Sequence, residues 1–140
     1  MTAITELKAL TDQFEIEVDC MVLDPERYLE QLVSLGVHRV IVHTKSTDKY
    51  EEILQHKASR GYQMGFAITN DESVDVLSPY IDRLDFVQVM GIAKVGEQGQ
   101  PFDVRTPQTV HMLRTLYPEL EIMVDGSVNE ETIPILKQAG

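Results

Sequence analysis

The chain has 140 residues, 43% of them apolar, and a formal net charge of −11 at pH 7. This length and composition fit one domain with a real core, and the acidic balance argues against a nucleic-acid-binding protein, which usually needs a basic face. No apolar run approaches the roughly 20 residues of a membrane span, and a single cysteine, Cys20, excludes an internal disulfide. We therefore expect a cytoplasmic protein with neither a membrane nor a nucleic-acid partner.

The first half of the chain predicts alternating helices and strands. Asp24 and Pro25 suit a helix start and Gly36 a helix end, because aspartate is a good N-cap, proline fits the first helical position and glycine favours the C-terminal turn. The expected elements are a helix over 5–13, a strand over 14–22, a helix over 24–36, a strand over 39–43 and a helix that ends before Gly61.

The second half continues the alternation. The expected elements are a strand over 62–69, a helix over 70–83, a strand over 85–90, an irregular connection over 91–103, a helix over 106–117, a strand over 120–124 and a helix over 129–139. Five strands, each followed by a helix, require crossover connections and so predict a parallel sheet covered by helices. We interpret residues 1–140 as a single α/β domain.

Functional side chains in parallel α/β folds lie where the strands end. The segment 122–132 is the most informative, because a strand there ends on Asp125 and a Gly-Ser turn leads into a helix. This order places a carboxylate beside backbone N–H groups that suit an anionic ligand. The alternative for Asp125 is a simple turn cap. His43 likewise has the alternative of an ordinary polar strand tip, and Met21 and Met90 that of core side chains.

Four segments carry a resemblance to a known family. They read MVLDPERYLEQLVSLGVHRVIVHTKST, GFAITND, DFVQVMGIAKVGEQGQPF and VDGSVNEET. Together, and in this order, they resemble the ribulose-phosphate 3-epimerases, which are (β/α)8 barrels that act on pentulose 5-phosphates. The resemblance runs from about residue 5 to 140. It implies an incomplete (β/α)8 TIM barrel in which this chain supplies strands resembling the third to the seventh of the family.

The resemblance also implies a chemistry and a metal. The family reaction moves a proton at the carbon beside a ketone, with two aspartates on opposite faces of the substrate and a divalent ion that stabilises the enediolate. Asp125 matches one aspartate and is expected to be the general acid/base and a metal ligand. Asp19 stands where the family has a metal-binding histidine and is expected to be a second ligand, to an ion of the Zn, Fe, Mn or Co class. The other aspartate and a further histidine ligand belong to a family strand that this sequence does not contain.

The substrate-binding residues come from the same resemblance. The family's phosphate loop matches residues 93–100, in which Glu97 adds an anion and Lys94 a compensating cation. The Asp-Gly-Gly turn of the family ends here on Ser127, whose Cβ restricts the approach of the backbone to phosphate. The residues expected to bind the sugar phosphate are Met21, His43, Met90, Gly99, Gln100, Gly126 and Ser127.

Three functional interpretations stay open at this point. The first is a metal-assisted epimerase that interconverts ribulose 5-phosphate and xylulose 5-phosphate. The second, which we favour, is that the 140 residues are a fragment of such an enzyme with impaired activity. The third is a non-catalytic protein that binds a sugar phosphate or assembles with other chains. Because open edges of a parallel sheet seek partners, we also expect a homo-oligomer.

Overall fold

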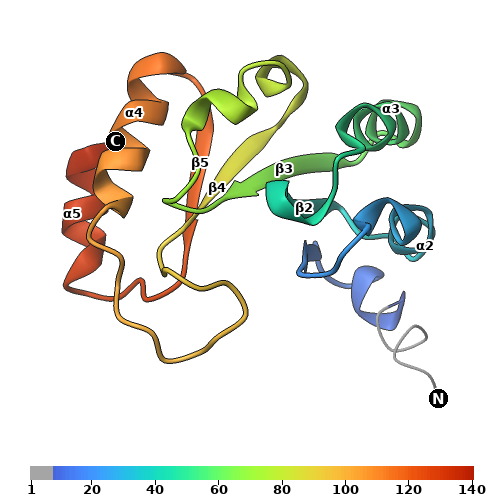
Figure 1. Cartoon of the computed structure of the whole chain (residues 1–140). Helices are drawn as coiled ribbons and strands as arrows, with labels where there is room; N and C mark the ends of the chain where they lie inside the picture. The colour runs from blue at the N-terminus through green and yellow to red at the C-terminus, as the bar shows by residue number, and fades with distance from the viewer. Residues whose placement is uncertain (1–7) are drawn as a thin grey trace. The chain divides into compact units, whose positions relative to one another are not determined.

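The computed structural model describes residues 8–140 and contains a five-stranded sheet in the order β1-β2-β3-β4-β5 (Figure 1). The strands are β1 (Glu17–Cys20), β2 (Arg39–His43), β3 (Gln63–Ile68), β4 (Phe86–Met90) and β5 (Glu121–Asp125). β1 pairs in parallel with β2, and β4 with β5. The prediction of a parallel α/β sheet with five strands is therefore confirmed.

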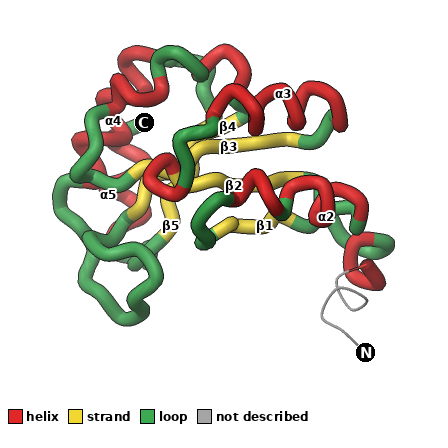
Figure 2. Tube along the Cα trace, turned by 45° about the vertical axis from the view of Figure 1, so that its right-hand side comes forward, coloured by secondary structure: helices red, strands yellow, loops and turns green. Residues whose placement is uncertain are grey.

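Between and after the strands, the described residues form the α-helices α2 to α5 and short 3-10 helices (Figure 2). The α-helices are α2 (Leu29–Ser34), α3 (Tyr50–Arg60), α4 (Thr106–Leu116) and α5 (Thr132–Ala139), and the 3-10 helices are η1 (Pro25–Arg27), η2 (Thr44–Ser46), η3 (Val74–Leu77) and η4 (Ile81–Arg83). Residues 8–11 are helical, whereas the start of the helix predicted over 5–13 lies outside the described residues. Within residues 8–140, no helix is both long and apolar enough to cross a membrane.

The chain divides into two compact units, one up to Gly65 and one from Phe66 onwards. That residues 1–140 act as a single domain stays a prediction.

In the first unit, the two faces of the β1–β2 pair differ in polarity. Glu17 pairs with Arg39 in the strand register, and their side chains form an ion pair with Oε2 and Nε 3.2 Å apart. Because side chains alternate along a strand, Asp19 and His43 lie on this same polar face. The other face is apolar and contributes Cys20, Val40 and Val42 to a buried core that also contains Leu29, Ile53 and Leu54.

In the second unit, the β4–β5 pair places Met90 opposite Asp125 at its carboxyl end. The face of β5 that carries Ile122 and Val124 turns toward α4 and α5, and a cavity of about 300 Å³ remains there between the strand and the helices. Met90 and Asp125 lie on the opposite face of the pair, in register with each other. Of the predicted site residues in this unit, these two therefore lie on the face away from α4 and α5.

The continuous helix predicted over 24–36 is wrong. Asp24 adopts a left-handed conformation with φ 53°, makes no side-chain cap, and forms an ion pair with Arg27 at 3.0 Å. Its backbone N–H donates to the carbonyl of Ser46 at 3.0 Å, in the turn after β2. This long-range bond holds Asp24 out of the capping conformation, so a 3-10 turn and a break at Tyr28 precede α2.

The helix predicted over 70–83 is also wrong, since two 3-10 turns stand in its place. The Asn70 side chain does not cap a helix but donates to the carbonyl of Met90 at 3.1 Å. Ser73 provides the cap instead, because its hydroxyl accepts from the N–H of Asp75 at 3.2 Å. Pro79, which lacks an N–H, then prevents the turns from joining into one helix.

Candidate functional site

The first unit brings together two of the predicted site residues. Asp19 is the third residue of β1 and His43 the last of β2, and their Oδ1 and Nε2 atoms lie 2.8 Å apart. An ionised carboxylate can only accept a hydrogen bond, so Nε2 carries the proton that it donates to Asp19. Both side chains are largely withdrawn from solvent, with 10% of His43 and 23% of Asp19 exposed. The pair is therefore a partly buried carboxylate–imidazole hydrogen bond at the end of two neighbouring strands.

The same distance bears on metal binding. Asp19 Oδ1 and His43 Nε2 lie 2.8 Å apart and form a hydrogen bond, while two ligands of one cation at about 2.1 Å lie nearly as close, at roughly 3 Å. His43 thus orients the Asp19 carboxylate, which is the usual task of a group behind a metal ligand. Among residues 8–140, no three acidic, histidine or cysteine side chains gather closely enough to hold a metal. The described side chains therefore do not complete a site for the divalent ion that the resemblance implies.

The two predicted methionines occupy different surroundings. Met21 follows β1 with 51% of its surface exposed. Met90 ends β4 and is fully buried, with its sulfur accepting a hydrogen bond from Nε2 of Gln88 at 3.5 Å. A ligand at the end of β1 can touch Met21 directly, whereas Met90 forms part of the packed interior of the second unit.

Asp125 ends β5 as an exposed residue, so its carboxylate is accessible. Its backbone carbonyl accepts a hydrogen bond from the N–H of Gly91 at 2.6 Å, which joins the ends of β4 and β5. The chains approach so closely here that a Cβ on Gly91 would lie 2.2 Å from the carbonyl oxygen of Gly126. Gly126 itself has φ +104°, a conformation that favours glycine. Two glycines thus shape the backbone beside Asp125.

The glycine loop, which we define as residues 91–103, meets the turn after β5. The side chain of Gln100 spans the loop, accepting from the N–H of Lys94 at 3.0 Å and donating to the carbonyl of Glu97 at 2.9 Å. The hydroxyl of Ser127 donates to the backbone carbonyl of Gln100. The loop and turn that sequence analysis assigned to phosphate therefore lie together, and the Gln100 side chain holds the loop in shape.

Ser127 pays a conformational cost at this turn. Its φ of +55° lies in the left-handed region, which costs a residue with a Cβ roughly 1 kcal/mol. Its hydrogen bond to Gln100 offsets part of this cost. At this turn the chain therefore has a residue that is less free in its backbone than glycine but that is hydrogen-bonded to the glycine loop.

Sequence analysis missed a second polar network in this unit. The guanidinium of Arg105 donates to Asp103 at 2.7 Å through Nη2 and to Asp71 at 2.6 Å through Nη1. The Arg105 hydrogen bonds, with a smaller contribution from Asn70, lower the pKa of Asp103 to about 2 despite its burial. The only signal in the sequence is an Asp and an Arg two residues apart before a helix start, and that pattern gives no hint of the partner at Asp71.

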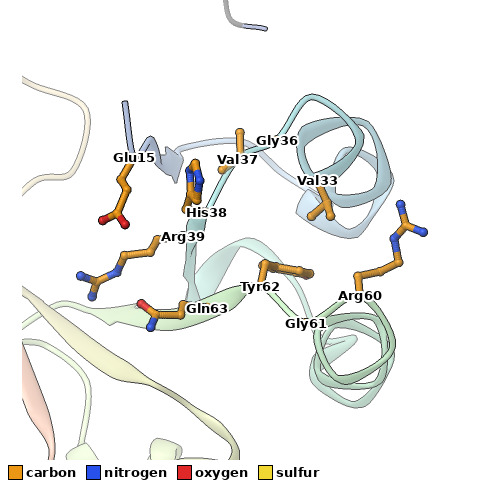
Figure 3. Close-up of a pocket in the computed structure, with 10 residues that line it drawn as sticks. All are labelled: Glu15, Val33, Gly36, Val37, His38, Arg39, Arg60, Gly61, Tyr62 and Gln63. Carbon is orange, nitrogen blue, oxygen red and sulfur yellow. The ribbon is translucent and has the colours of Figure 1, made fainter. Parts of the chain in front are cut away.

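A cavity of about 450 Å³ lies at the amino ends of β2 and β3 in the first unit (Figure 3). None of the predicted site residues lines it. Three of its polar side chains have partners within the chain: Arg39 pairs with Glu17 at 3.2 Å, Nδ1 of His38 accepts from the Ile16 N–H at 3.2 Å, and the Tyr62 hydroxyl bonds His56 at 3.1 Å. The pKa of Tyr62 is raised, mainly by burial, so this hydroxyl stays protonated. We assign no ligand to this cavity.

Comparison with solved structures supports the fold. The chain superposes on the tryptophan synthase α-subunit of Pyrococcus furiosus with a TM-score of 0.74 and 14% identity, covering 99% of this chain and 59% of that one. It superposes on 3-hexulose-6-phosphate synthase from Salmonella typhimurium with a TM-score of 0.73 and 14% identity, covering 98% and 66%. These similarities bear on the architecture alone. They agree with an open sheet of the TIM-barrel type.

Comparison of sequences is more specific. The chain is 34% identical over 139 residues to the ribulose-phosphate 3-epimerase of Schizosaccharomyces pombe and 29% identical over 143 residues to that of Chlamydia pneumoniae. These matches cover 96% and 98% of the chain but 60% and 62% of the relatives, so the chain spans about three fifths of their length. The sequence model of the ribulose-phosphate 3-epimerase family matches residues 1–140. The chain therefore belongs to the ribulose-phosphate 3-epimerase family.

Proposed function

We propose that this chain carries one side of a site that interconverts ribulose 5-phosphate and xylulose 5-phosphate. The observation that carries the proposal is the position of Asp125, an exposed carboxylate at the end of β5 beside a turn that is bonded to the glycine loop. The names of the relatives support the same substrate class. With its phosphate at the loop after β4, a sugar phosphate is proposed to direct its carbon chain toward Asp125 at the end of the neighbouring strand, β5.

Asp125 is the proposed acid/base group. Its carboxylate takes the proton from the carbon beside the ketone, and the electron pair of the C–H bond moves into an enediolate. Inversion then requires an acid on the opposite face to return a proton. The resemblance places that acid on a strand that this sequence does not contain, so Asp125 alone would exchange a proton on one face without inverting the carbon.

Phosphate binding is proposed for the glycine loop and the Gly126-Ser127 turn. Gly96, Gly99 and Gly126 all have positive φ values, a conformation in which neighbouring backbone N–H groups can turn toward one anion. Glu97 opposes this, although Lys94 lies 3.8 Å from its carboxylate and balances its charge. For the first unit by itself, His43 and Met21 are proposed as substrate-binding residues.

Asp19 in the first unit and Asp125 in the second each offer a carboxylate of the kind that binds a divalent ion of the Zn, Fe, Mn or Co class, and each is proposed as a metal ligand within its own unit. Catalytic metal sites usually supply about three protein ligands, and the described residues do not provide such a group. The ion would add stabilisation of the enediolate charge. We assign it no step here.

The proposal is tested by incubating the 140-residue protein with ribulose 5-phosphate in D2O and following the substrate by NMR. We expect deuterium to enter at the carbon beside the ketone with little or no xylulose 5-phosphate formed. Exchange should fall on the order of 100-fold in Asp125→Asn, because loss of a general base typically costs that much. The control Asp82→Asn, an exposed residue of η4, should retain the exchange.

Two outcomes would contradict this expectation. Equal exchange in the wild type and in Asp125→Asn would remove Asp125 from the chemistry. Robust epimerisation that is lost in Asp125→Asn would show that the chain contains both proton-transfer groups and is a complete catalyst.

A non-catalytic sugar-phosphate-binding protein is the second candidate. Two departures favour it: Asp19 is bonded to His43, and Ser127 stands in a left-handed turn where the family has glycine. This candidate would be selected if ribulose 5-phosphate shifts the NMR signals of the Gly126 and Ser127 amides but exchanges no proton with solvent.

Self-association through the sheet edges is a further part of the proposal. β1 and β5 each pair with one strand in the described sheet, so each leaves one edge to a possible partner. We expect light scattering to report a mass above the 15.9 kDa of one chain, rising with concentration. A monodisperse monomer over the same range would contradict this.

A further inference from the structure

We propose that Asn70 and Arg105 are positioning residues that clamp the two ends of the glycine loop. The inference rests on the proposed phosphate role of that loop, and it assigns the conformation of the loop to two side chains outside it. Neither residue needs to touch the ligand for this effect.

Asn70 holds the start of the loop. Its Nδ2 donates to the carbonyl of Met90 at 3.1 Å, directly before Gly91, and to the hydroxyl of Thr106 at 2.9 Å. Its Oδ1 accepts from the hydroxyl of Thr109 at 2.7 Å. Thr106 and Thr109 are buried in α4, so the amide joins the end of β4 to the first turns of the helix that follows the loop.

Arg105 holds the end of the loop. Its Nε and Nη2 reach the two carboxylate oxygens of Asp103, at 3.0 Å and 2.7 Å, in a fork that fixes the plane of the carboxylate. The Asp103 side chain is 7% exposed, whereas that of Arg105 is 47% exposed, so the carboxylate is buried and water reaches the pair only from the arginine side. The backbone N–H of Asp103 donates to the carbonyl of Gly91 at 2.8 Å, so both ends of the loop meet at one point.

Asp71 extends the clamp to the segment that follows β3. Nη1 of Arg105 donates to its carboxylate at 2.6 Å, and both side chains are about half exposed. Because exposed ion pairs contribute little, we expect Asp71 to matter less than Asp103. The clamp thus joins one half-exposed arginine to a buried inner carboxylate, Asp103, and to a half-exposed outer carboxylate, Asp71.

The inner part of the loop depends on these anchors. Gln100 links Lys94 and Glu97 within the loop, and Ser127 reaches it from the next turn, but neither contact fixes the loop ends. Loss of the clamp should therefore let the loop open without unfolding the sheet. The N–H groups proposed to face phosphate would then lose their common direction.

Limited trypsin digestion tests the clamp, because Lys94 is the single trypsin site between Gly91 and Asp103. We expect trypsin to cleave Arg105→Gln after Lys94 about tenfold faster than wild type. Charge-assisted hydrogen bonds restrain local opening of the chain to this extent. Arg105→Lys should restore part of the protection and Asp71→Asn should change it least. Asn70→Ala should also accelerate cleavage. Arg83→Gln, which removes an arginine from η4, is the matched control.

Each measurement is made where circular dichroism shows the variant folded. Cleavage after Lys94 that is equal in wild type, Arg105→Gln and Asn70→Ala would overturn the proposal, as would equal acceleration in Arg83→Gln. Affinity for inorganic phosphate, measured by NMR on the same proteins, should fall in parallel with protection. If the wild type fails to bind phosphate while the cleavage pattern holds, the clamp stands and the proposed function of the loop fails.

Discussion

Replacing Gly91 with alanine should destabilise the second unit by more than any other glycine substitution in the loop. The added Cβ would lie 2.2 Å from the carbonyl oxygen of Gly126, a backbone atom that no side-chain rotation can move. Relief of this clash requires β4 and β5 to separate at the point where Gly91 donates to Asp125 at 2.6 Å. We expect a loss of roughly 3 kcal/mol or more in unfolding free energy.

Gly96→Ala is the matched control in the same loop. A Cβ at Gly96 would meet no atom within 4 Å, although its φ of +85° still disfavours a side chain. Its cost should therefore stay near 1 to 2 kcal/mol, the usual penalty of the left-handed region. Urea unfolding followed by circular dichroism measures both variants. Equal losses would show that conformation, and not the close approach to Gly126, sets the need for glycine at Gly91.

The strands could be predicted because their signals are local. The segments that became β2 and β4 are short runs rich in β-branched or large apolar residues, and both are almost entirely buried. Gly61 likewise ends α3 with φ 73°, as a glycine after a helix predicts. In these elements the local preference and the tertiary environment agree.

The helices predicted over 24–36 and 70–83 do not form as predicted, because the residues expected to cap them make hydrogen bonds elsewhere. Asp24 and Asn70 are both good N-cap types, but one hydrogen bonds to Ser46 through its backbone and the other to Met90 through its side chain. These partners lie about 20 residues away, beyond any local pattern. Tertiary hydrogen bonds therefore overrode the local preference.

In the candidate site, too, contacts that follow from strand pairing could be predicted, whereas long-range contacts between irregular segments could not. Strand alternation accounts for Asp19 beside His43 and for Met90 opposite Asp125, because parallel strands bring their ends to one edge. The roles of these residues in catalysis and binding stay predictions. The Arg105 contact with Asp71 spans 34 residues and joins two irregular segments, so no periodicity in the sequence could reveal it.

The stability difference between wild type and Asp103→Asn should depend on pH. Hydrogen bonds from Arg105 lower the pKa of Asp103 from an ordinary 3.8 to about 2, so the folded state favours the ionised carboxylate. A group with a lowered folded pKa contributes its stability above the unfolded value and loses it as pH falls through the folded value. The contribution should be complete above about pH 4 and nearly gone near pH 2, with an upper limit of roughly 2 kcal/mol.

Urea unfolding of both proteins from pH 7 down to pH 2 measures this difference, and Asp82→Asn in the exposed η4 serves as the reference for loss of a surface carboxylate. Taking differences between variants removes the contributions of the other acidic residues, which both proteins share. A gap that persists unchanged at pH 2 would mean that the shape of the Asp103 side chain, and not its charge, holds Arg105. If the difference in unfolding free energy instead disappears between pH 4 and pH 2, the end of the glycine loop is held by an ionic contact. In that case, acid should open the loop before the sheet unfolds, and amide hydrogen exchange should detect the opening.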